Sequence, residues 1–360
     1  MRRAAPLILG GGPAGSAAAI TLARAGVRPI VLERTRETGD ALCGGFLSWR
    51  TLDRLRSLGL DADRLNRRRI TRVHVFAEDR EAQAPLPFPA LAVSRHKLDT
   101  LMLELADRAG AGVERGVTAR TAAGREVTLA DGATLDPPAL FLATGKHDLR
   151  GLARPKPDGD PTLGIRVRLR PSDVERRRIE DAIELHLFDR GYAGLAVQED
   201  GSANLCLAVR RSRLHEAGDP ERLLQGIAAE LPAFADRLDM RPDAAPTDAV
   251  ANVPYGWRAT DGAAGLFRLG DQAAVIPSLA GEGMGIAVAS GCSAAGAYLR
   301  GGADASVRWQ CSFARRAARP VRVAGLVRDL AEGPVAAPAL PWLGRVPGLL
   351  QMIARATRIR

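Results

Sequence analysis

Three glycines near the N-terminus have the spacing of a phosphate-binding turn. Gly10, Gly12 and Gly15 follow the apolar segment 6–9 and open an alanine-rich segment that ends near Gly26. Glycines at these positions allow a tight turn, a close approach of the backbone to a pyrophosphate, and close packing of a helix on a strand. The phosphates would lie at the helix N-terminus, where free N–H groups and the helix dipole favour negative charge.

An acidic residue completes this pattern. Residues 27–32 have the composition of a second buried strand, and Glu33 closes it. A carboxylate at this point accepts hydrogen bonds from a ribose 2′-hydroxyl and disfavours a 2′-phosphate. Residues 6–33 therefore predict a strand, helix and strand that bind FAD or NAD in preference to NADP.

A second glycine-rich pattern lies far along the chain. Residues 266–269 indicate a strand, Gly270-Asp271 follows it, and a turn with Gly281, Gly283 and Gly285 opens a further helix. The N-terminus of that helix can stabilise negative charge on a bound group. Two such patterns in one chain favour a bound dinucleotide cofactor over glycine-rich turns that bind nothing.

Together, the segments GGGPAG…E and GD…P…GEGM resemble the FAD-dependent monooxygenases of the p-hydroxybenzoate hydroxylase type and their relatives, the geranylgeranyl reductases. The resemblance covers roughly residues 7–300. It implies that Asp271 binds the flavin ribityl chain and that the helix after Gly281 directs its dipole at the pyrimidine edge of the flavin. The residues implied to bind FAD are Gly10, Gly12, Pro13, Ala14, Gly15, Glu33, Arg34, Cys43, Gly44, Arg95, Val117, Thr144, Gly145, Gly270, Asp271, Pro277, Gly281, Gly283, Met284 and Gly285.

Two shorter segments extend the resemblance. In AVSRHKLD, Ser94 can cap a helix and Arg95 can then reach the cofactor phosphates or adenosine, although a surface position for Arg95 is the alternative. The segment DALCGG is similar to the CGG loop of geranylgeranyl reductases, which passes beside the flavin. Cys43 is therefore either a residue of the substrate cavity or a small packing residue.

The segment ATGKHD, residues 143–148, ends an apolar run. In the hydroxylases this junction usually reads Asp-Gly, whereas Thr144-Gly145 stands here. The resemblance still implies FAD binding, but the missing carboxylate weakens the inference that NADPH docks in the usual manner. Lys146 and His147 either attract an anionic electron donor or are exposed turn residues.

The middle of the chain predicts a sheet. Residues 162–170 alternate apolar side chains with Arg166, Arg168 and Arg170, which is typical of a strand with one buried face, and the arginines are expected on a solvated face. Further strands with turn signals between them follow. The resemblance places a substrate between such a sheet and the flavin, and the candidate pocket residues are Cys43, Phe46, His186, Tyr192 and Tyr255. His186 alternates with leucines, so a solvent-facing or structural role is favoured over a catalytic one.

We expect an α/β protein with a Rossmann-like FAD-binding domain and a mainly antiparallel β-sheet substrate domain, as in flavoproteins of the glutathione reductase type. The FAD-binding domain is discontinuous, with residues 1–69, 90–150 and 259–300; residues 70–89 form a β-ribbon insertion, residues 151–258 the substrate domain, and residues 301–360 a C-terminal helical region. The basic amphipathic tail from Leu349 either contacts an anionic membrane or caps the body.

Composition excludes several classes. The net charge of +10 is carried almost wholly by arginine, aromatic residues make up 4%, and no basic block is interleaved with aromatics, so nucleic-acid binding is not expected. The four cysteines are scattered without metal-ligand spacing. No apolar run approaches the roughly 20 residues that span a bilayer. We expect a cytoplasmic monomer or homodimer, with peripheral membrane contact through the tail as the alternative.

The sequence predicts a FAD-dependent oxidoreductase. The first hypothesis is a monooxygenase that uses NAD(P)H as a transient electron donor and O2 on a phenolic, polyketide-like or other small hydrophobic molecule. The alternative is a reductase or dehydrogenase of polyprenyl or other lipid-like C=C bonds, although Gly194 stands where geranylgeranyl reductases carry the tryptophan of a YxW pattern. The third possibility is a non-enzymatic dinucleotide-binding protein. The chain lacks a WxWxIP stretch, which argues against a halogenase.

Overall fold

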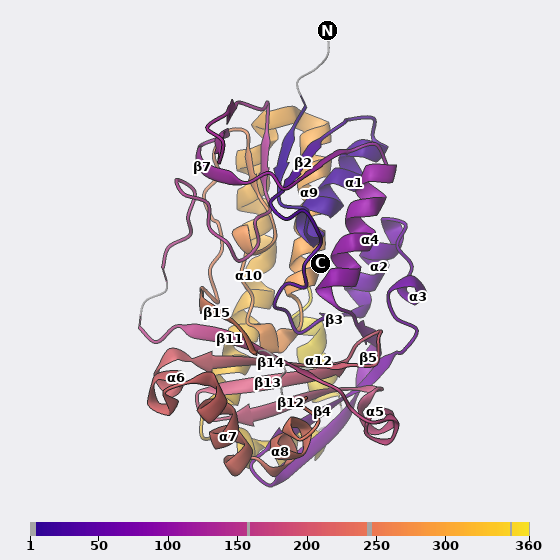
Figure 1. Ribbon diagram of the computed structural model, residues 1–360, viewed down its shortest axis with the longest axis vertical. Helices are drawn as coiled ribbons and strands as arrows, with labels where there is room; N and C mark the ends of the chain where they lie inside the picture. Colours follow the sequence, from indigo (N-terminus) through magenta and orange to yellow (C-terminus); the bar gives the residue numbers. More distant parts are fainter. Residues whose placement is uncertain (1–4, 157–158, 243–246, 346–347, 360) are drawn as a thin grey trace.

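The computed structural model describes residues 5–156, 159–242, 247–345 and 348–359. It contains two main layers of β-structure, one above the other in Figure 1: a parallel sheet surrounded by helices, and below it a larger sheet that carries helices on its outer face. This is the α/β architecture that the sequence predicts.

The parallel sheet holds the two glycine patterns. Its strand order is β16-β10-β1-β2-β6, with β16 at Leu266–Arg268, β10 at Leu140–Leu142, β1 at Leu7–Leu9, β2 at Ile30–Glu33 and β6 at Gly112–Arg115. Helix α1 (Pro13–Arg24) packs between α4 (Arg95–Arg108) and α9 (Gly283–Gly301). A Cβ atom at Gly291 would collide with the carbonyl oxygen of Ala14, so glycine permits the close approach of α9 to α1.

A small antiparallel sheet covers the other face of the parallel sheet. It consists of β7 (Ala119–Ala123), β8 (Glu126–Leu129) and β9 (Thr134–Leu135). Leu7, Leu9 and Leu142 face this sheet, whereas Ile8 and Phe141 face the helices. The short strands are apolar on both faces because both faces are covered.

The larger sheet has the strand order β15-β11-β14-β13-β12-β4-β5-β3. These strands are β15 (Thr247–Val253), β11 (Thr162–Leu169), β14 (Ala203–Arg210), β13 (Gly191–Val197), β12 (Ala182–Phe188), β4 (Ile70–Ala77), β5 (Arg80–Ala92) and β3 (Phe46–Leu47). All pairs are antiparallel except β4 with β12. The ribbon predicted at residues 70–89 is thus a hairpin that forms part of the larger sheet.

Helices cover both faces of the larger sheet. On the outer face, α5 (Asp173–Ile179), α6 (Arg211–Ala217), α7 (Pro220–Glu230) and α8 (Pro232–Leu238) carry residues that pack on Ile165, Val167 and Leu205. On the inner face lie the end of α10 (Ala305–Ala331) and the helices α11 (Ala336–Arg345) and α12 (Leu349–Ala356), whereas most of α10 packs with α9 and the parallel sheet. Helices α2 (Trp49–Ser57) and α3 (Ala62–Leu65) flank the parallel sheet. Within the described ranges, no helix is both long and apolar enough to cross a membrane.

Candidate functional site

A cavity of about 1150 Å³ lies where the parallel sheet, the inner face of the larger sheet and the C-terminal helices meet. Ligand pockets of proteins usually measure roughly 300–1,000 Å³, so this cavity has room for a cofactor together with a substrate. The glycine turns line one part of it, and aliphatic side chains line the rest.

The first glycine turn has the backbone geometry of a phosphate-binding loop. Gly10 adopts a φ of +103°, and a Cβ atom there would lie 2.5 Å from the carbonyl oxygen of Ala143. A side chain at Gly15 would collide with the carbonyl oxygen of Gly10. Helix α1 begins directly after Gly12 with Pro13, whose fixed φ suits the first helical position. The free N–H groups of this helix therefore face the cavity.

Glu33 holds the turn from the end of β2. Its Oε2 accepts a hydrogen bond from the Gly11 N–H at 2.8 Å, and its Oε1 accepts from the backbone and hydroxyl of Thr35 at 3.0 and 2.9 Å. The side chain also lines the cavity. The carboxylate is thus fixed beside the glycine turn, where a ribose would be bound.

Arg95 lies beside Gly12 at the start of α4. Ser94 caps this helix by accepting from the Lys97 N–H, and Arg95 donates to Asp99 from Nε at 2.8 Å and from Nη2 at 2.6 Å. Burial opposes the charge, but the carboxylate of Asp99 outweighs it and raises the pKa of Arg95. Arg95 is therefore a charged guanidinium at the glycine turn, and the alternative of a surface position is wrong.

The second glycine pattern lines another part of the same cavity. Asp271 lines the cavity from the 3₁₀ turn Gly270–Gln272, and its carbonyl oxygen accepts from Arg154 at 3.0 Å. Gly281 adopts a φ of +61°, where a Cβ atom would lie 2.7 Å from the ring of Phe46. Helix α9 then begins at Gly283 with its N-terminus at the cavity.

The segment ATGKHD connects the two patterns. Thr144 donates to the carbonyl oxygen of His147 at 2.6 Å and closes the turn. Gln272 donates to the carbonyl oxygen of Gly145 at 2.9 Å, and Arg154 to that of Lys146 at 2.8 Å. This junction therefore ties the end of β10 to the Asp271 turn without a carboxylate at the position of Thr144.

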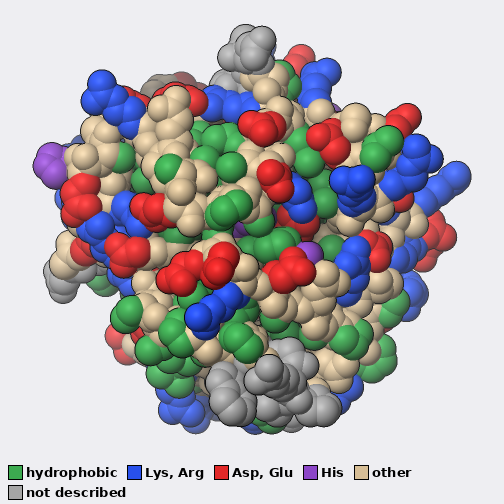
Figure 2. All heavy atoms as spheres, turned by 90° about the horizontal axis from the view of Figure 1, so that it is seen from below, with side chains coloured by type: hydrophobic (Ala, Val, Ile, Leu, Met, Phe, Trp, Pro, Cys, Tyr) green, Lys and Arg blue, Asp and Glu red, His purple; other side chains and the backbone are tan. Residues whose placement is uncertain are grey.

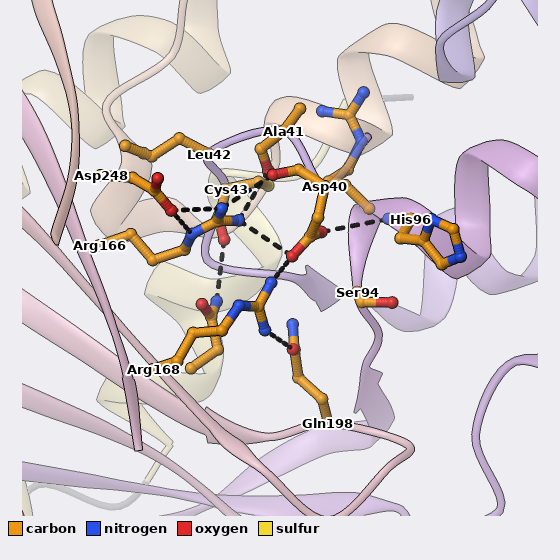
Figure 3. A network of polar contacts seen from close by, with 12 residues as sticks. Asp40, Ala41, Leu42, Cys43, Ser94, His96, Arg166, Arg168, Gln198 and Asp248 are labelled. Atoms are coloured by element: carbon orange, nitrogen blue, oxygen red, sulfur yellow. Dashed lines mark hydrogen bonds and ion pairs between the residues drawn. The ribbon is translucent and has the colours of Figure 1, made fainter. Parts of the chain in front are cut away.

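Cationic and amide side chains hold consecutive carbonyl groups of the loop 40–43 (Figure 3). Arg166 donates to the carbonyl oxygens of Asp40 and Ala41 at 2.8 and 3.2 Å. Lys146 donates to that of Leu42 at 2.6 Å, and Asn204 to that of Cys43 at 2.8 Å. The loop that resembles the CGG loop is thus held over the cavity from β11, β14 and the ATGKHD turn.

The arginine row of β11 does not form a solvated face. Arg166 is buried, lines the cavity, and pairs with Asp248 at 2.6 Å and Asp40 at 3.2 Å. Arg168 also contacts Asp40 and donates to Gln198 at 3.0 Å (Figure 3). Only Arg170 is exposed. The period of two predicts the strand correctly, but the loop 40–43 and β15 cover its polar face.

Two tyrosines meet in the cavity. The hydroxyl of Tyr192 lies 2.7 Å from Ser278 Oγ, and Tyr255 donates to the same oxygen at 2.8 Å. The backbone N–H of Leu279 donates to Tyr192 at 3.0 Å. Burial raises the pKa of both phenols, that of Tyr192 well above its ordinary value. Both groups therefore remain neutral hydroxyls that can share hydrogen bonds with an oxygen of a ligand.

His186 lies on the opposite face of the larger sheet from the cavity, so the proposal that it is a pocket residue is wrong. Its ring stacks on Phe76, meets the edge of Phe234, and lies 3.4 Å from Glu184. Its neighbours Leu185 and Leu187 line the cavity. The alternation in β12 therefore correctly predicts that His186 and its leucine neighbours point to opposite faces of the sheet. The face that carries His186 is buried by α8 instead of being exposed to solvent.

Most of the predicted site residues come together at the cavity. The lining includes Gly10, Gly12, Pro13, Ala14, Glu33, Arg34, Cys43, Gly44, Phe46, Arg95, Val117, Thr144, Gly145, Tyr192, Tyr255, Gly270, Asp271, Gly281, Gly283 and Met284. Gly15 packs on the first turn, and Gly285 on Glu282 and Thr51. Pro277 precedes the 3₁₀ turn Ser278–Ala280, which carries the serine shared by the tyrosines.

The sequence did not reveal the residues that hold the loop 40–43. Asn204 and Asp248 belong to no motif, and Asp40 begins the DALCGG segment without any signal that it pairs with Arg166. Their partners lie far away in the chain. Arg358 and Glu282, which form a buried ion pair, were also missed. The one signal for this ion pair in the sequence was Glu282 itself, an acidic residue inside the GEGM segment and directly before a helix N-terminus.

The residues present fit FAD. The glycine turn requires glycine by geometry, a helix N-terminus and Arg95 supply positive charge beside it, and Glu33 marks the ribose position. Asp271 and the N-terminus of α9 lie at the same cavity. The fold and this site define a FAD-dependent oxidoreductase of the two-domain flavoprotein type.

Comparisons with known proteins agree with this class. A family model described as an FAD binding domain matches residues 3–137. The chain is 30% identical over 344 residues to the menaquinone reductase of Mycolicibacterium smegmatis, covering 89% of this chain and 83% of the relative. It is 29% identical to the menaquinone reductase of Mycobacterium tuberculosis H37Rv, covering 88% and 81%. The chain therefore belongs to this family of FAD-dependent oxidoreductases.

Solved structures share the fold. PqsL of Pseudomonas aeruginosa, a probable FAD-dependent monooxygenase, superposes with a TM-score of 0.72 at 18% identity and covers 94% of this chain and 99% of its own. The flavin-dependent halogenase CmlS superposes with a TM-score of 0.74 at 21% identity, covering 93% and 66%. These likenesses establish the architecture and leave the reaction open.

Proposed function

We propose that this protein is a FAD-dependent reductase of a lipophilic quinone or polyprenyl compound. The observation that carries the proposal is the long apolar part of the cavity beyond the tyrosine pair. The sheet contributes Val73, Val75, Leu86, Ile183, Leu185 and Leu187, and the C-terminal helices contribute Val327, Leu330, Ala331, Leu350 and Ile353. Such a lining favours an extended hydrocarbon chain, which gains roughly 25 cal/mol per Å² of apolar surface removed from water.

The tyrosine pair supports an oxygen-bearing head group on that chain. Tyr192, Tyr255 and Ser278 place hydroxyl groups at the inner end of the apolar lining. Neutral hydroxyls suit a carbonyl or hydroxyl oxygen, because a buried polar atom of the ligand needs a hydrogen-bond partner. The names of the curated relatives, menaquinone reductases, point to the same substrate class.

Bound FAD would supply the redox chemistry, and NADH or NADPH is proposed as its transient electron donor. The glycine turn, Glu33 and Arg95 would hold the cofactor. The loop 40–43, fixed by Arg166 and Lys146, would exclude water from the reacting centre.

A monooxygenase that acts on a phenolic ring is the second candidate. The same tyrosine pair favours it, because neutral phenol groups can donate to the oxygen of a phenolic substrate. We rank the reductase above the monooxygenase because a small phenolic ring would leave much of the apolar lining beyond the tyrosines uncovered.

The test is a comparison of turnover with and without O2. FAD-loaded protein is reduced with NADH or NADPH and mixed with a menaquinone or with a geranylgeranyl lipid, and the products are analysed by mass spectrometry. Anaerobic consumption of the reductant with formation of a hydrogenated product supports the reductase. Product that forms only with O2 and carries an oxygen atom from it would overturn the reductase in favour of the monooxygenase.

A further inference from the structure

The outward face of helix α10 changes from basic to apolar along its length. Arg315, Arg319 and Arg322 are exposed at successive turns, and Leu326 and Leu330 continue the same stripe, each 60% exposed. Residues three and four apart share one side of a helix, so these side chains form one continuous strip. Apolar side chains exposed singly are ordinary, whereas apolar side chains that adjoin one another on a surface mark an interaction site.

This apolar end of α10 lies at an opening of the cavity. Leu330 lines the cavity and is 60% exposed, and Val335 lines it and is 49% exposed. A side chain that contacts both the cavity and the solvent marks a mouth. The apolar part of the cavity thus opens between the end of α10 and the start of α11.

Helix α12 adds to the same surface. Leu349, Leu350 and Ile353 line the cavity, whereas Met352 points outward and is 61% exposed. Arg355 is exposed and lies 5.9 Å from the ring centre of Phe88. Figure 2, which shows the molecule from below, shows hydrophobic side chains that reach the surface in several places, with basic and acidic side chains between them.

We propose that this C-terminal helix face, made of Leu326, Leu330, Val335 and Met352 with Arg319, Arg322 and Arg355, docks on an anionic lipid bilayer. The arginines complement anionic headgroups, and the apolar side chains enter the region between headgroups and acyl chains. Among the exposed side chains of α10 from Arg315 onward, Asp329 is the only acid that opposes this charge. The mouth of the cavity would then open directly into the lipid, so that a lipophilic substrate enters without crossing water.

The buried end of the tail limits which residues take part. Arg358 and Ile359 are buried against the body, so the last residues that the structure describes do not extend into the lipid. The proposal therefore rests on α10 and the outward side of α12. The sequence-based alternative of membrane contact through the tail is thus extended to a face that α12 shares with α10.

The test is sedimentation of the FAD-loaded full chain with vesicles. Wild-type protein is expected to bind phosphatidylcholine vesicles that contain phosphatidylglycerol, and to bind them less as salt is added. Substituting Leu326→Glu with Met352→Glu should weaken binding about tenfold or more, because acids replace side chains that enter the lipid. Substituting Arg319→Glu with Arg322→Glu should weaken binding to anionic vesicles by more than about tenfold, since each basic residue contributes roughly fivefold.

Val174→Glu is the matched control, because Val174 is an exposed valine on α5, on the outer face of the larger sheet. All variants should keep the FAD absorbance of the wild type, since none of these residues lines the cavity. The proposal is overturned if wild-type protein does not bind anionic vesicles, or if Val174→Glu weakens binding as much as the α10 variants. It is also overturned if Leu326→Glu converts a dimer into a monomer, because the face would then be covered by a second copy. Binding is measured without substrate, so the result is independent of the proposed reaction.

Discussion

Arg358 donates from Nη1 to Oε2 of Glu282 at 2.9 Å, and both side chains are buried. Arg358 also donates to the carbonyl oxygen of Ala280 at 2.6 Å, and the Ile359 N–H donates to the second oxygen of Glu282 at 3.2 Å. Glu282 directly precedes α9. The end of the C-terminal tail is therefore fixed to the turn that opens α9, whose N-terminus lies at the cavity.

Loss of this ion pair should destabilise the protein strongly. Arg358→Ala leaves the carboxylate of Glu282 buried without its cationic partner, and we expect the free energy of unfolding to fall by about 3–5 kcal/mol. Denaturant unfolding of the FAD-free and FAD-loaded protein measures this loss. Arg355→Ala on the exposed side of α12 is the control, with a change within about 0.5 kcal/mol. If both variants changed the free energy of unfolding by the same small amount, the tail would not be anchored through Arg358 and Glu282.

Glu33 should control FAD affinity. Glu33→Gln removes the charge that accepts hydrogen bonds from Gly11 and Thr35 and that faces the ribose position. Hydrogen bonds to charged groups contribute about 1.5–3 kcal/mol, so the Kd for FAD should rise by roughly 10 to 100 times. Quenching of flavin fluorescence during titration measures the Kd. Glu37→Gln, at an exposed position just beyond β2, should leave it unchanged.

Arg166 and Arg170 should behave differently although they belong to one strand pattern. Arg166→Met frees the carbonyl groups of Asp40 and Ala41 and removes the partner of Asp248, and should cost about 1–3 kcal/mol of unfolding free energy. The released loop should also let bound FAD dissociate faster. Arg170→Met, on an exposed side chain, should change neither quantity. Stopped-flow measurement of FAD release together with denaturant unfolding compares the two variants.

The two cavity tyrosines should affect the substrate more than the cofactor. Tyr255→Phe removes a hydroxyl that donates to Ser278, and Tyr192→Phe also leaves the Leu279 N–H without its acceptor. We expect kcat/KM to fall by about 10 to 100 times, equivalent to roughly 1.4–2.8 kcal/mol, with the Kd for FAD unchanged. Tyr298→Phe is the control, because Tyr298 packs on Phe141 beside the parallel sheet. A rise in the FAD Kd without a change in kcat/KM would contradict a substrate role.

The buried Glu184 and His186 should make the protein less stable in acid. Burial lowers the pKa of His186 below its ordinary 6.5, and although burial opposes ionisation of Glu184, hydrogen bonds from His186 and Arg237 hold the pKa of that carboxyl at about 2. The unfolded chain therefore takes up a proton on His186 below about pH 6.5 that the folded chain does not. The free energy of unfolding should fall below that pH by up to about 1.4 kcal/mol per pH unit. Glu184 adds a further loss as the pH falls below its ordinary 4.5 towards 2.

Denaturant unfolding between roughly pH 7 and 5 tests this slope. His186→Gln cannot be protonated, so its stability should depend less on pH than that of the wild type, even if the variant is less stable throughout. His215→Gln, on an exposed side chain of α6, should keep the wild-type slope. Parallel curves for wild type and His186→Gln would refute a proton-linked loss at His186.

The parts of the site that the sequence predicts are those in which backbone geometry dictates residue type. Gly10 and Gly15 leave no room for a side chain, Glu33 ends strand β2, and Asp271 follows strand β16 at a fixed offset. These constraints are local and remain visible in one sequence. The alternation of residues also predicts the strands β11 and β12 and the opposite orientation of His186 and its leucine neighbours.

The parts that the sequence does not predict depend on partners far away in the chain. Which face of β11 is solvated depends on the loop 40–43 and on β15, and neither can be placed from the period of two. The outer face of β12 is buried because α8 brings Phe234 against His186. The anchoring of Arg358 likewise requires the tail to return to Glu282, a contact with no signature in either segment.

The order of strands has a consequence for the newly made chain. Arg72 on β4 pairs with Ala182 on β12, and Leu140 on β10 pairs with Leu266 on β16, so each sheet joins segments that are synthesised at different times. Pairing across such sequence separations slows folding, because the chain loses the entropy of loop closure before the contacts between the paired strands stabilise it. During translation the glycine turn at residues 10–15 emerges first, but its cofactor pocket stays incomplete until Gly283 has left the ribosome. We therefore expect this chain to capture FAD late in its biogenesis.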